Sequence, residues 1–186
     1  MNLQIPRLTP TQRRRDAGVR PHVGIVVLNW NNYPASERCL RSLLGISYPA
    51  TTVYLVDNGS VDSSMERLEH EFAARGVVCM RNGENLGFAA GCNAGIARAL
   101  ADGCAYVLLI NNDCIVARQS LLEDAVALAE ADPSCGIIGG KLLYWPETAR
   151  IWGVGGRIRW SHDKEAASEP SGPENPQDHE LALCGA

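Results

Sequence analysis

The sequence predicts an open α/β fold, with a mainly parallel, doubly wound sheet and helices on both of its faces. Short apolar runs rich in β-branched residues alternate along the chain with segments whose apolar residues recur at helical spacing. These runs are continuous, as is typical of strands that are buried on both faces. Strands that alternate with helices need right-handed crossover connections, which produce a parallel sheet.

The first unit begins with a strand at 23–28, where the sequence reads Val-Gly-Ile-Val-Val-Leu. A polar stretch at 29–32 ends this strand. Leucines then recur at helical spacing over 34–44, where Pro34 suits the first turn and Gly45 suits the exit. We therefore expect one strand followed by one helix.

The same strand-and-helix unit recurs downstream. The helix at 65–72 has Met65, Leu68 and Phe72 along one side, and Ser60 or Asp62 is placed to cap it. The further strands are expected at 52–56, 77–80 and 105–110, and the further helices at 88–100 and 121–128.

The pattern changes after residue 136. We expect one more strand at 137–144 and an irregular, glycine-rich segment at 152–160. The segment 161–180 is rich in charged residues and prolines, so we expect an exposed, disordered loop there. An apolar segment begins at 181–186, so the predicted sheet is incomplete at this end of the chain.

Composition limits the class of protein and its compartment. The net charge of −4 gives no general basic field, which argues against a nucleic-acid partner. Arg13, Arg14 and Arg15 lie in a leader, 1–21, that we expect to be a flexible tail, with contact to an anionic membrane surface as the alternative. The chain has no secretory signal and no apolar run of membrane-spanning length.

Cysteine usage points to a reducing compartment. There are seven cysteines, an odd number, and none forms a C-x-x-C pair. Cys79, Cys104 and Cys114 lie in or beside apolar runs, where a thiol behaves as a small hydrophobic group. We expect a cytoplasmic protein, with peripheral attachment at the inner face of the cell membrane left open. The oligomeric state is also left open.

Polar clusters follow each of the first four predicted strands. Turn formation explains any one of them singly, because Asn, Asp, Gly and Ser are the usual turn residues. Together they would meet at one edge of the sheet, where ligands bind in open α/β folds. The clusters lie at 29–32, 57–60, 81–82 and 111–113.

The sequence also restricts how a ligand would be held. Neither a P-loop nor the glycine-rich turn of a dinucleotide fold follows the first strand. A pyrophosphate would instead be bridged by a divalent cation, and Asp113 stands where a cation ligand would be rigidly supported. Asp57 lies at the same level of the sheet, where its carboxylate can accept the ring N–H of a pyrimidine base.

Glycines recur every four residues over 87–95 and would therefore share one face of a helix. Close packing of helix on sheet explains Gly87 and Gly91 as well as ligand binding does. Asn93 is a polar amide among small residues, which suggests a group aimed at a ligand or at the loop after the first strand.

Four motifs together resemble the family 2 glycosyltransferases of the GT-A fold, the nucleotide-diphospho-sugar transferase type, and within them the branch that includes rhamnosyl and galactofuranosyl transferases. The resemblance covers about residues 22–160. The motifs are Val-Val-Leu-Asn-Trp-Asn at 26–31, Val-Asp-Asn-Gly-Ser at 56–60, Asn-Leu-Gly-Phe-Ala-Ala-Gly-Cys-Asn-Ala-Gly at 85–95 and Leu-Leu-Ile-Asn-Asn-Asp at 108–113.

The resemblance implies roles for individual residues. Asp57 would bind the base, and Asp113 would bind Mg²⁺ or Mn²⁺ beneath the diphosphate. This chain has Asn111 where the family's D-x-D element has its first aspartate, which should weaken metal affinity but still allows a bond to a ribose hydroxyl. The remaining residues expected at the nucleotide are Leu28, Asn29, Trp30, Asn31, Asn58, Asn85, Asn93 and Asn112.

The activity that the resemblance implies is an inverting, metal-dependent transfer of a sugar from a UDP- or dTDP-sugar to a glycan or lipid-linked acceptor, as in cell-wall or polysaccharide biosynthesis. The general base of relatives would lie beyond Ala186, because Glu147, Asp163 and Glu165 lack the family's context. We therefore expect 22–160 to be the donor-binding domain and 181–186 to begin the acceptor side, with no transfer by this chain alone. The alternatives are a non-catalytic nucleotide-sugar-binding module and, less favoured without a phosphate loop, a nucleotidyltransferase.

Overall fold

A computed structural model describes residues 20–132, 134–154, 156–159, 167–170 and 182–185. The chain divides into two compact units. The first contains the residues up to Arg41 together with Pro49–Asn112, and the second contains Ser42–Tyr48 and the residues from Asp113 onward. Arg13, Arg14 and Arg15 of the predicted leader lie outside the described residues.

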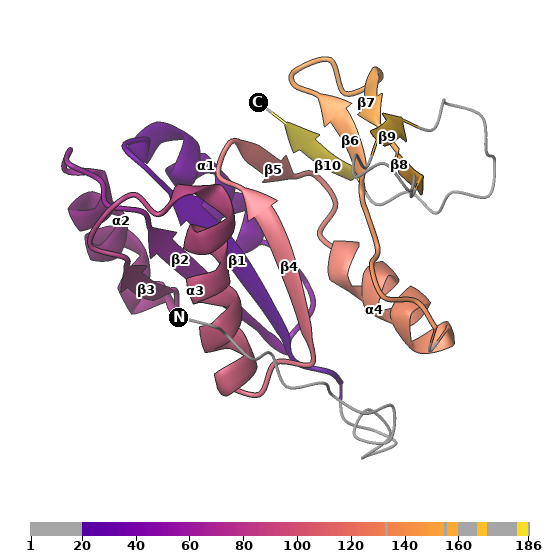
Figure 1. Cartoon of the computed structure of the whole chain (residues 1–186), viewed down its shortest axis with the longest axis horizontal. Coiled ribbons are helices and arrows are strands. Elements are labelled where there is room, and N and C mark those ends of the chain that lie inside the picture. Colours follow the sequence, from indigo (N-terminus) through magenta and orange to yellow (C-terminus); the bar gives the residue numbers. More distant parts are fainter. Residues whose placement is uncertain (1–19, 133, 155, 160–166, 171–181, 186) are drawn as a thin grey trace. The chain divides into compact units, whose positions relative to one another are not determined.

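The first unit is built on a four-stranded parallel sheet with the strand order β3-β2-β1-β4 (Figure 1). β1 is a continuous apolar run and is buried along almost its whole length, as its sequence predicts. The structure therefore confirms the predicted parallel sheet. The strands are β1 (Val23–Asn29), β2 (Thr51–Asp57), β3 (Val78–Arg81) and β4 (Tyr106–Asn111).

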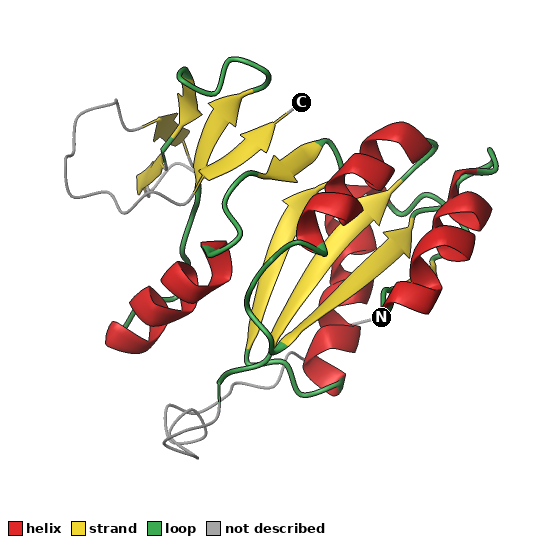
Figure 2. Cartoon of the chain, turned by 180° about the vertical axis from the view of Figure 1, so that it is seen from behind, coloured by secondary structure: helices red, strands yellow, loops and turns green. Residues whose placement is uncertain are grey.

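Helices cover both faces of this sheet, as the alternation of strands and helices predicts. α3 lies on one face, and α1 and α2 lie on the other (Figures 1 and 2). A short 3₁₀ turn, Ala73–Arg75, continues α2. The helices are α1 (Tyr33–Leu43), α2 (Ser64–Phe72) and α3 (Gly87–Ala101).

The apolar side chains of β1 and β2 alternate between two buried layers. On the α3 side, Val26, Tyr54, Val56, Ala99 and Cys104 form one cluster. The intervening strand residues and the apolar sides of α1 and α2 are also buried. Burial raises the pKa of the Cys104 thiol, which therefore stays protonated and packs as a small apolar group.

Asp62, and not Ser60, supports the start of α2. Ser63 occupies the N-cap position without a side-chain bond, while the Asp62 carboxylate accepts the N–H of Ser64 at 3.0 Å. The Ser60 hydroxyl donates to Asp57 instead. Neither predicted residue is therefore the N-cap itself, although Asp62, the residue before it, binds the first N–H of the helix.

Two glycines of α3 allow the helix to lie close to β1. A Cβ atom at Gly91 would come within 2.8 Å of Leu28 Cδ1, and one at Gly95 within 2.6 Å of Val26 Cγ1. The packing interpretation is therefore right for Gly91. Gly87 differs, because its Cβ would meet open space and its φ of +77° is what favours glycine there.

Within the described residues, the second unit contains six short strands and a helix in addition to Ser42–Tyr48. One sheet has the order β5-β10-β6-β7, in which β10 is parallel to β6 and antiparallel to β5. A second, antiparallel pair joins β8 to β9. The elements are β5 (Cys114–Val116), α4 (Leu121–Ala131), β6 (Lys141–Tyr144), β7 (Ile151–Gly153), β8 (Gly156–Arg159), β9 (Ala167–Pro170) and β10 (Ala182–Gly185).

Several predictions for the second unit are wrong. β5 was not expected, and the strand expected at 137–144 begins only at Lys141. The segment 152–160 is not irregular throughout, because it contributes to β7 and β8, and residues 167–170 of the expected loop form β9. The rest of 161–180 lies outside the described residues. Strands of three or four residues are too short to show a periodic pattern of apolar residues. Whether such a segment forms a strand therefore depends on its pairing with distant segments.

Within the described residues, none of the helices combines the length and the apolar character that a membrane crossing would need.

The close approach of α3 to β1 gives a stability prediction. Gly95→Ala should lower the free energy of unfolding by about 1 kcal/mol, because overpacking costs about 1–3 kcal/mol and the helix preference of alanine offsets only part of that cost. Urea unfolding followed by circular dichroism measures the change. Gly136→Ala is the control, since a Cβ there meets nothing within 4 Å. Equal stability of the two variants would contradict the packing role.

Candidate functional site

The first four strands end at one edge of the parallel sheet, where the order of the strands reverses. β2 and β3 lie on one side of β1, whereas β4 lies on the other. Ligands of open α/β folds bind at this point, outside the carboxyl ends of the strands. Asn29, Asp57 and Asn111 are the last residues of β1, β2 and β4, and Asn29 lies directly beside Asp57 in the register of the sheet.

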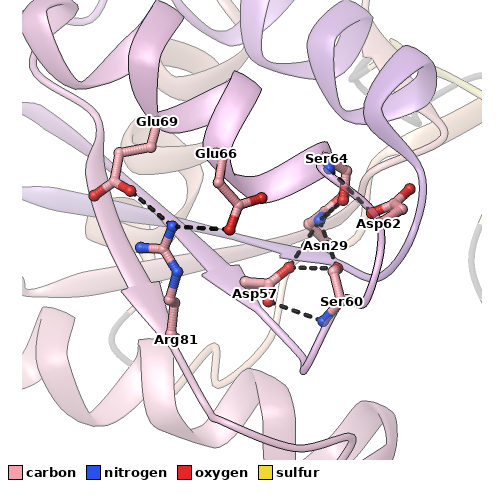
Figure 3. A network of polar contacts seen from close by, with 8 residues as sticks. All are labelled: Asn29, Asp57, Ser60, Asp62, Ser64, Glu66, Glu69 and Arg81. Carbon is pink, nitrogen blue, oxygen red and sulfur yellow. Dashed lines mark hydrogen bonds and ion pairs between the residues drawn. The ribbon is translucent and has the colours of Figure 1, made fainter.

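Asp57 is a buried carboxylate held by three donors. Its Oδ1 accepts the amide of Asn29 at 2.9 Å and the hydroxyl of Ser60, and its Oδ2 accepts the Ser60 N–H at 3.0 Å (Figure 3). The residue is only 4% exposed. An ionised carboxylate has about four acceptor positions. Donors among the described residues use three of them, which leaves one position on Oδ2 for a ligand.

Asn29 supports Asp57 and is completely buried. Its Nδ2 contacts Asp57, the hydroxyl of Ser60 at 3.1 Å and the hydroxyl of Ser64 at 3.1 Å. Its Oδ1 accepts the hydroxyl of Ser36 at 2.7 Å, and the residue is completely buried. The side chain therefore lies under the site and does not line it.

Two further serines, Ser36 and Ser64, belong to this network and were not predicted from the sequence. Both are buried, and Ser36 also accepts Asn112 Nδ2 at 2.9 Å. One signal was present. Ser36 lies at helical spacing from Leu40, on the apolar side of α1, where a hydroxyl needs a buried partner.

The loop after β1 is fastened to the loop after β2. Asn31 adopts a φ of +49° and accepts the N–H groups of Val61 at 2.8 Å and Asp62 at 3.3 Å through its side chain. Its own N–H donates to Ser60 Oγ at 2.9 Å. Asn31 therefore shapes the loop. The neighbouring Trp30 is 53% exposed at this edge, and its ring is available for stacking.

Asn58 organises the segment that leads into α3. It is 3% exposed, donates to Asn85 Oδ1 at 2.8 Å, and accepts Asn82 Nδ2 at 3.1 Å and the N–H of Leu86 at 3.2 Å. Asn85 Oδ1 also accepts the N–H of Gly87 at 2.9 Å. Asn58 is therefore a structural bridge, whereas Asn85 is exposed and its Nδ2 has no partner in the described part of the chain.

Other predicted site residues lie further from this network. Leu28 packs with its side chain under Gly91. Asn93 is exposed on the side of α3 opposite the glycines that face the sheet, so the expected contact with the first loop is absent from the described residues. Asn111 is exposed at the end of β4.

Asp113 begins the second unit, two residues after the last residue of β4. It is exposed, and among the described residues its carboxylate has no ion-pair partner. Within the same residues, no group of three or more His, Cys, Asp or Glu side chains is arranged to hold a metal ion.

A cation of the protein itself lies beside Asp57. Arg81, the last residue of β3, is in register with Asp57 and forms ion pairs with Glu69 at 2.8 Å and Glu66 at 3.8 Å (Figure 3). The hydrogen bond to Glu69 raises the pKa of Arg81, and Glu66 and Asp57 add to the effect. The α2 carboxylates thus hold a guanidinium next to the base-binding candidate.

Comparison with known proteins gives one family. The profile described as "Glycosyl transferase family 2" matches residues 24–175. No curated protein matches the sequence significantly.

Solved structures share the fold. A mannosyltransferase from Pyrobaculum calidifontis, in complex with GDP-Man and Mn²⁺, is 24% identical, with a TM-score of 0.56 over 68% of this chain and 36% of that one. Residues 1–349 of S. aureus TarS are 20% identical, with a TM-score of 0.54 over 66% of this chain and 35% of that one, and the same protein was solved with UDP-GlcNAc. This chain spans about a third of the length of these structures.

The bridging role of Asn58 is testable. Asn58→Ala should lower the free energy of unfolding by about 1–3 kcal/mol, because it leaves buried donors and acceptors without partners. Hydrogen exchange of the Leu86 and Gly87 amides should also become faster. Asn93→Ala is the matched control and should change stability by less than about 0.5 kcal/mol. Similar effects of the two substitutions would show that Asn58 is not a bridge.

Proposed function

The chain belongs to glycosyl transferase family 2, and on that premise we propose that its carboxyl-edge site binds the nucleotide of a UDP- or dTDP-sugar for transfer of the sugar to a glycan or lipid-linked acceptor. The sheet of the first unit is the mainly parallel central sheet of the GT-A fold. The proposal extends to inversion at the anomeric carbon, to the rhamnosyltransferase-like branch, and to cell-wall or polysaccharide biosynthesis at the cytoplasmic side of the membrane. The four sequence motifs support these finer assignments.

The state of Asp57 is the observation that carries the proposal. One acceptor position, on Oδ2, remains after the bonds from Asn29 and Ser60. Uracil and thymine each present a single ring N–H, which one position can accept. Guanine presents adjacent N1–H and N2–H groups that call for both carboxylate oxygens, and Oδ1 is already used. The lone-pair count therefore favours a pyrimidine nucleotide.

Two neighbouring groups suit the rest of a pyrimidine nucleoside. Trp30 offers an exposed ring at the same edge of the sheet, and aromatic rings stack on bases. Arg81, the neighbour of Asp57 in the register of the sheet, has further N–H donors on the guanidinium that pairs with Glu66 and Glu69, and a pyrimidine has carbonyl oxygens on either side of its N–H. An arrangement of Asp57 as acceptor and Arg81 as donor would suit the N–H and a neighbouring carbonyl oxygen of the pyrimidine.

The residues fit a divalent cation bound together with the substrate. Mg²⁺ is usually held by one or two carboxylates together with substrate phosphates and water, and Asp113 is one exposed carboxylate without a competing ion pair in the described chain. We assign Asp113 as the protein ligand of Mg²⁺ or Mn²⁺. When bound, the cation offsets the charge that develops on the leaving diphosphate.

Asp57→Asn tests the base-binding role. The change replaces the last acceptor position with an amide, so affinity for UDP or dTDP should fall by about tenfold or more, as expected for a hydrogen bond to a charged group. Calorimetric titration with UDP-, dTDP- and GDP-sugars measures it. Asp62→Asn, on the same loop, is the control, since an amide oxygen also accepts the Ser64 N–H. Unaltered affinity in Asp57→Asn would remove this role.

Asp113→Asn tests the metal site separately. We expect the gain in UDP or dTDP affinity that Mn²⁺ gives the wild type to be largely lost, because the only assigned charged protein ligand is gone. Affinity for uridine, which has no phosphate, should stay as it is. Titrations with and without Mn²⁺ measure both. An undiminished effect of Mn²⁺ in the variant would mean that another residue holds the cation.

A further inference from the structure

A buried series of hydrogen bonds joins the end of β4 to the end of β2, within the first unit. We name it the relay, and its members are Asn112, Ser36, Asn29 and Asp57. Asn112 Nδ2 lies 2.9 Å from Ser36 Oγ, Ser36 Oγ lies 2.7 Å from Asn29 Oδ1, and Asn29 Nδ2 lies 2.9 Å from Asp57 Oδ1. The relay therefore connects the residue before Asp113 to the carboxylate proposed to bind the base.

The charge of Asp57 fixes the direction of every bond in the relay. An ionised carboxylate only accepts, so Asn29 must present its NH₂ group to Asp57 and its carbonyl oxygen to Ser36. Ser36 has one hydroxyl hydrogen, which it must donate to Asn29. Asn112 must then donate to Ser36 through Nδ2.

This ordering fixes how the amide of Asn112 is turned. Because its Nδ2 faces Ser36, the carbonyl oxygen is the acceptor that Asn112 offers a ligand, and Asn112 is half-buried at the edge of the sheet. A carbonyl oxygen accepts a hydroxyl hydrogen or binds a divalent cation. The orientation of this amide is thus set by a carboxylate two strands away in the sheet.

We propose that Ser36 is a positioning residue that couples the orientation of the Asn112 amide to the acceptor state of Asp57, so that the diphosphate side and the base side of the site are set together. This inference rests on the proposed function, because it takes Asp57 as the base-binding group. Ser36 and Asn29 are completely buried, so water cannot readily replace a bond that either of them loses.

Asn112→Asp should reverse the hydrogen bond between residue 112 and Ser36, so that Ser36 becomes the donor. A carboxylate at this position cannot donate to Ser36, and it competes for the single Ser36 hydrogen with a charge-assisted bond that is stronger than the bond to Asn29. Asn29 Oδ1 then loses its donor and the support of Asp57 is weakened. Asn112→Ala removes the donor to Ser36 but leaves Ser36 free to donate to Asn29.

The test is titration of the full chain with uridine and thymidine, without metal, followed by NMR. These nucleosides carry no charge, so repulsion from a new carboxylate does not affect the comparison. We expect Asn112→Asp to bind them about five- to tenfold more weakly than Asn112→Ala, the loss expected for one internal hydrogen bond. Asn32→Asp adds the same charge in the loop before α1 and keeps the bond to the Ala35 N–H, so it should bind like the wild type.

Ser36→Ala completes a double-mutant cycle with Asn112→Asp. On its own it should weaken nucleoside binding to a similar extent. The double variant should bind less than about twofold more weakly than Ser36→Ala, because the hydroxyl for which the new carboxylate competes is absent. Equal nucleoside affinity of Asn112→Asp and Asn112→Ala would overturn the coupling, and that comparison does not depend on the folding of Ser36→Ala. A wild-type chain that binds neither nucleosides nor UDP would overturn the proposed function as well.

Discussion

The edge of the sheet is organised around one buried charge, the carboxylate of Asp57. Removing a carboxylate from water is costly unless hydrogen bonds replace the solvent. The protein supplies three of them from Asn29 and Ser60. The same requirement determines which atoms Asn29, Ser36 and Asn112 turn toward one another, so the local structure of three strand ends follows from one charge.

The parallel sheet makes this arrangement possible. Because β1, β2 and β4 run in the same direction, their polar last residues meet at one edge although they are far apart in the chain. Gly91 and Gly95 allow α3 to approach β1 closely, and Asn58 then fixes the segment before α3. The position of the site is therefore a consequence of strand direction, and its rigidity comes from the packing beneath it.

Membership of the family indicates a protein of the sugar-transferring type. The free acceptor position of Asp57 then restricts which base we propose that the site binds. A carboxylate with one free acceptor position, next to a guanidinium and an exposed indole ring, forms an edge that suits a pyrimidine base. The similar solved structures have less than 25% identity and share only the fold with this chain. The proposed preference for a pyrimidine nucleotide thus rests on this chain's own residues.

The sequence alone determined the order of strands and helices in the first unit and the meeting of the polar strand ends, Asp57 among them, at one edge of the sheet, because these depend on local periodicity and on polar residues at strand ends. Only the tertiary structure decided that Asn29 and Asn58 are supports, that Ser36 and Ser64 complete the network, and that Asn93 lies away from it. It also decided the short strands of the second unit, such as β5. These features depend on which segments distant in the chain come into contact. Such a contact produces no repeating pattern in the sequence of either segment, so it cannot be predicted from local periodicity.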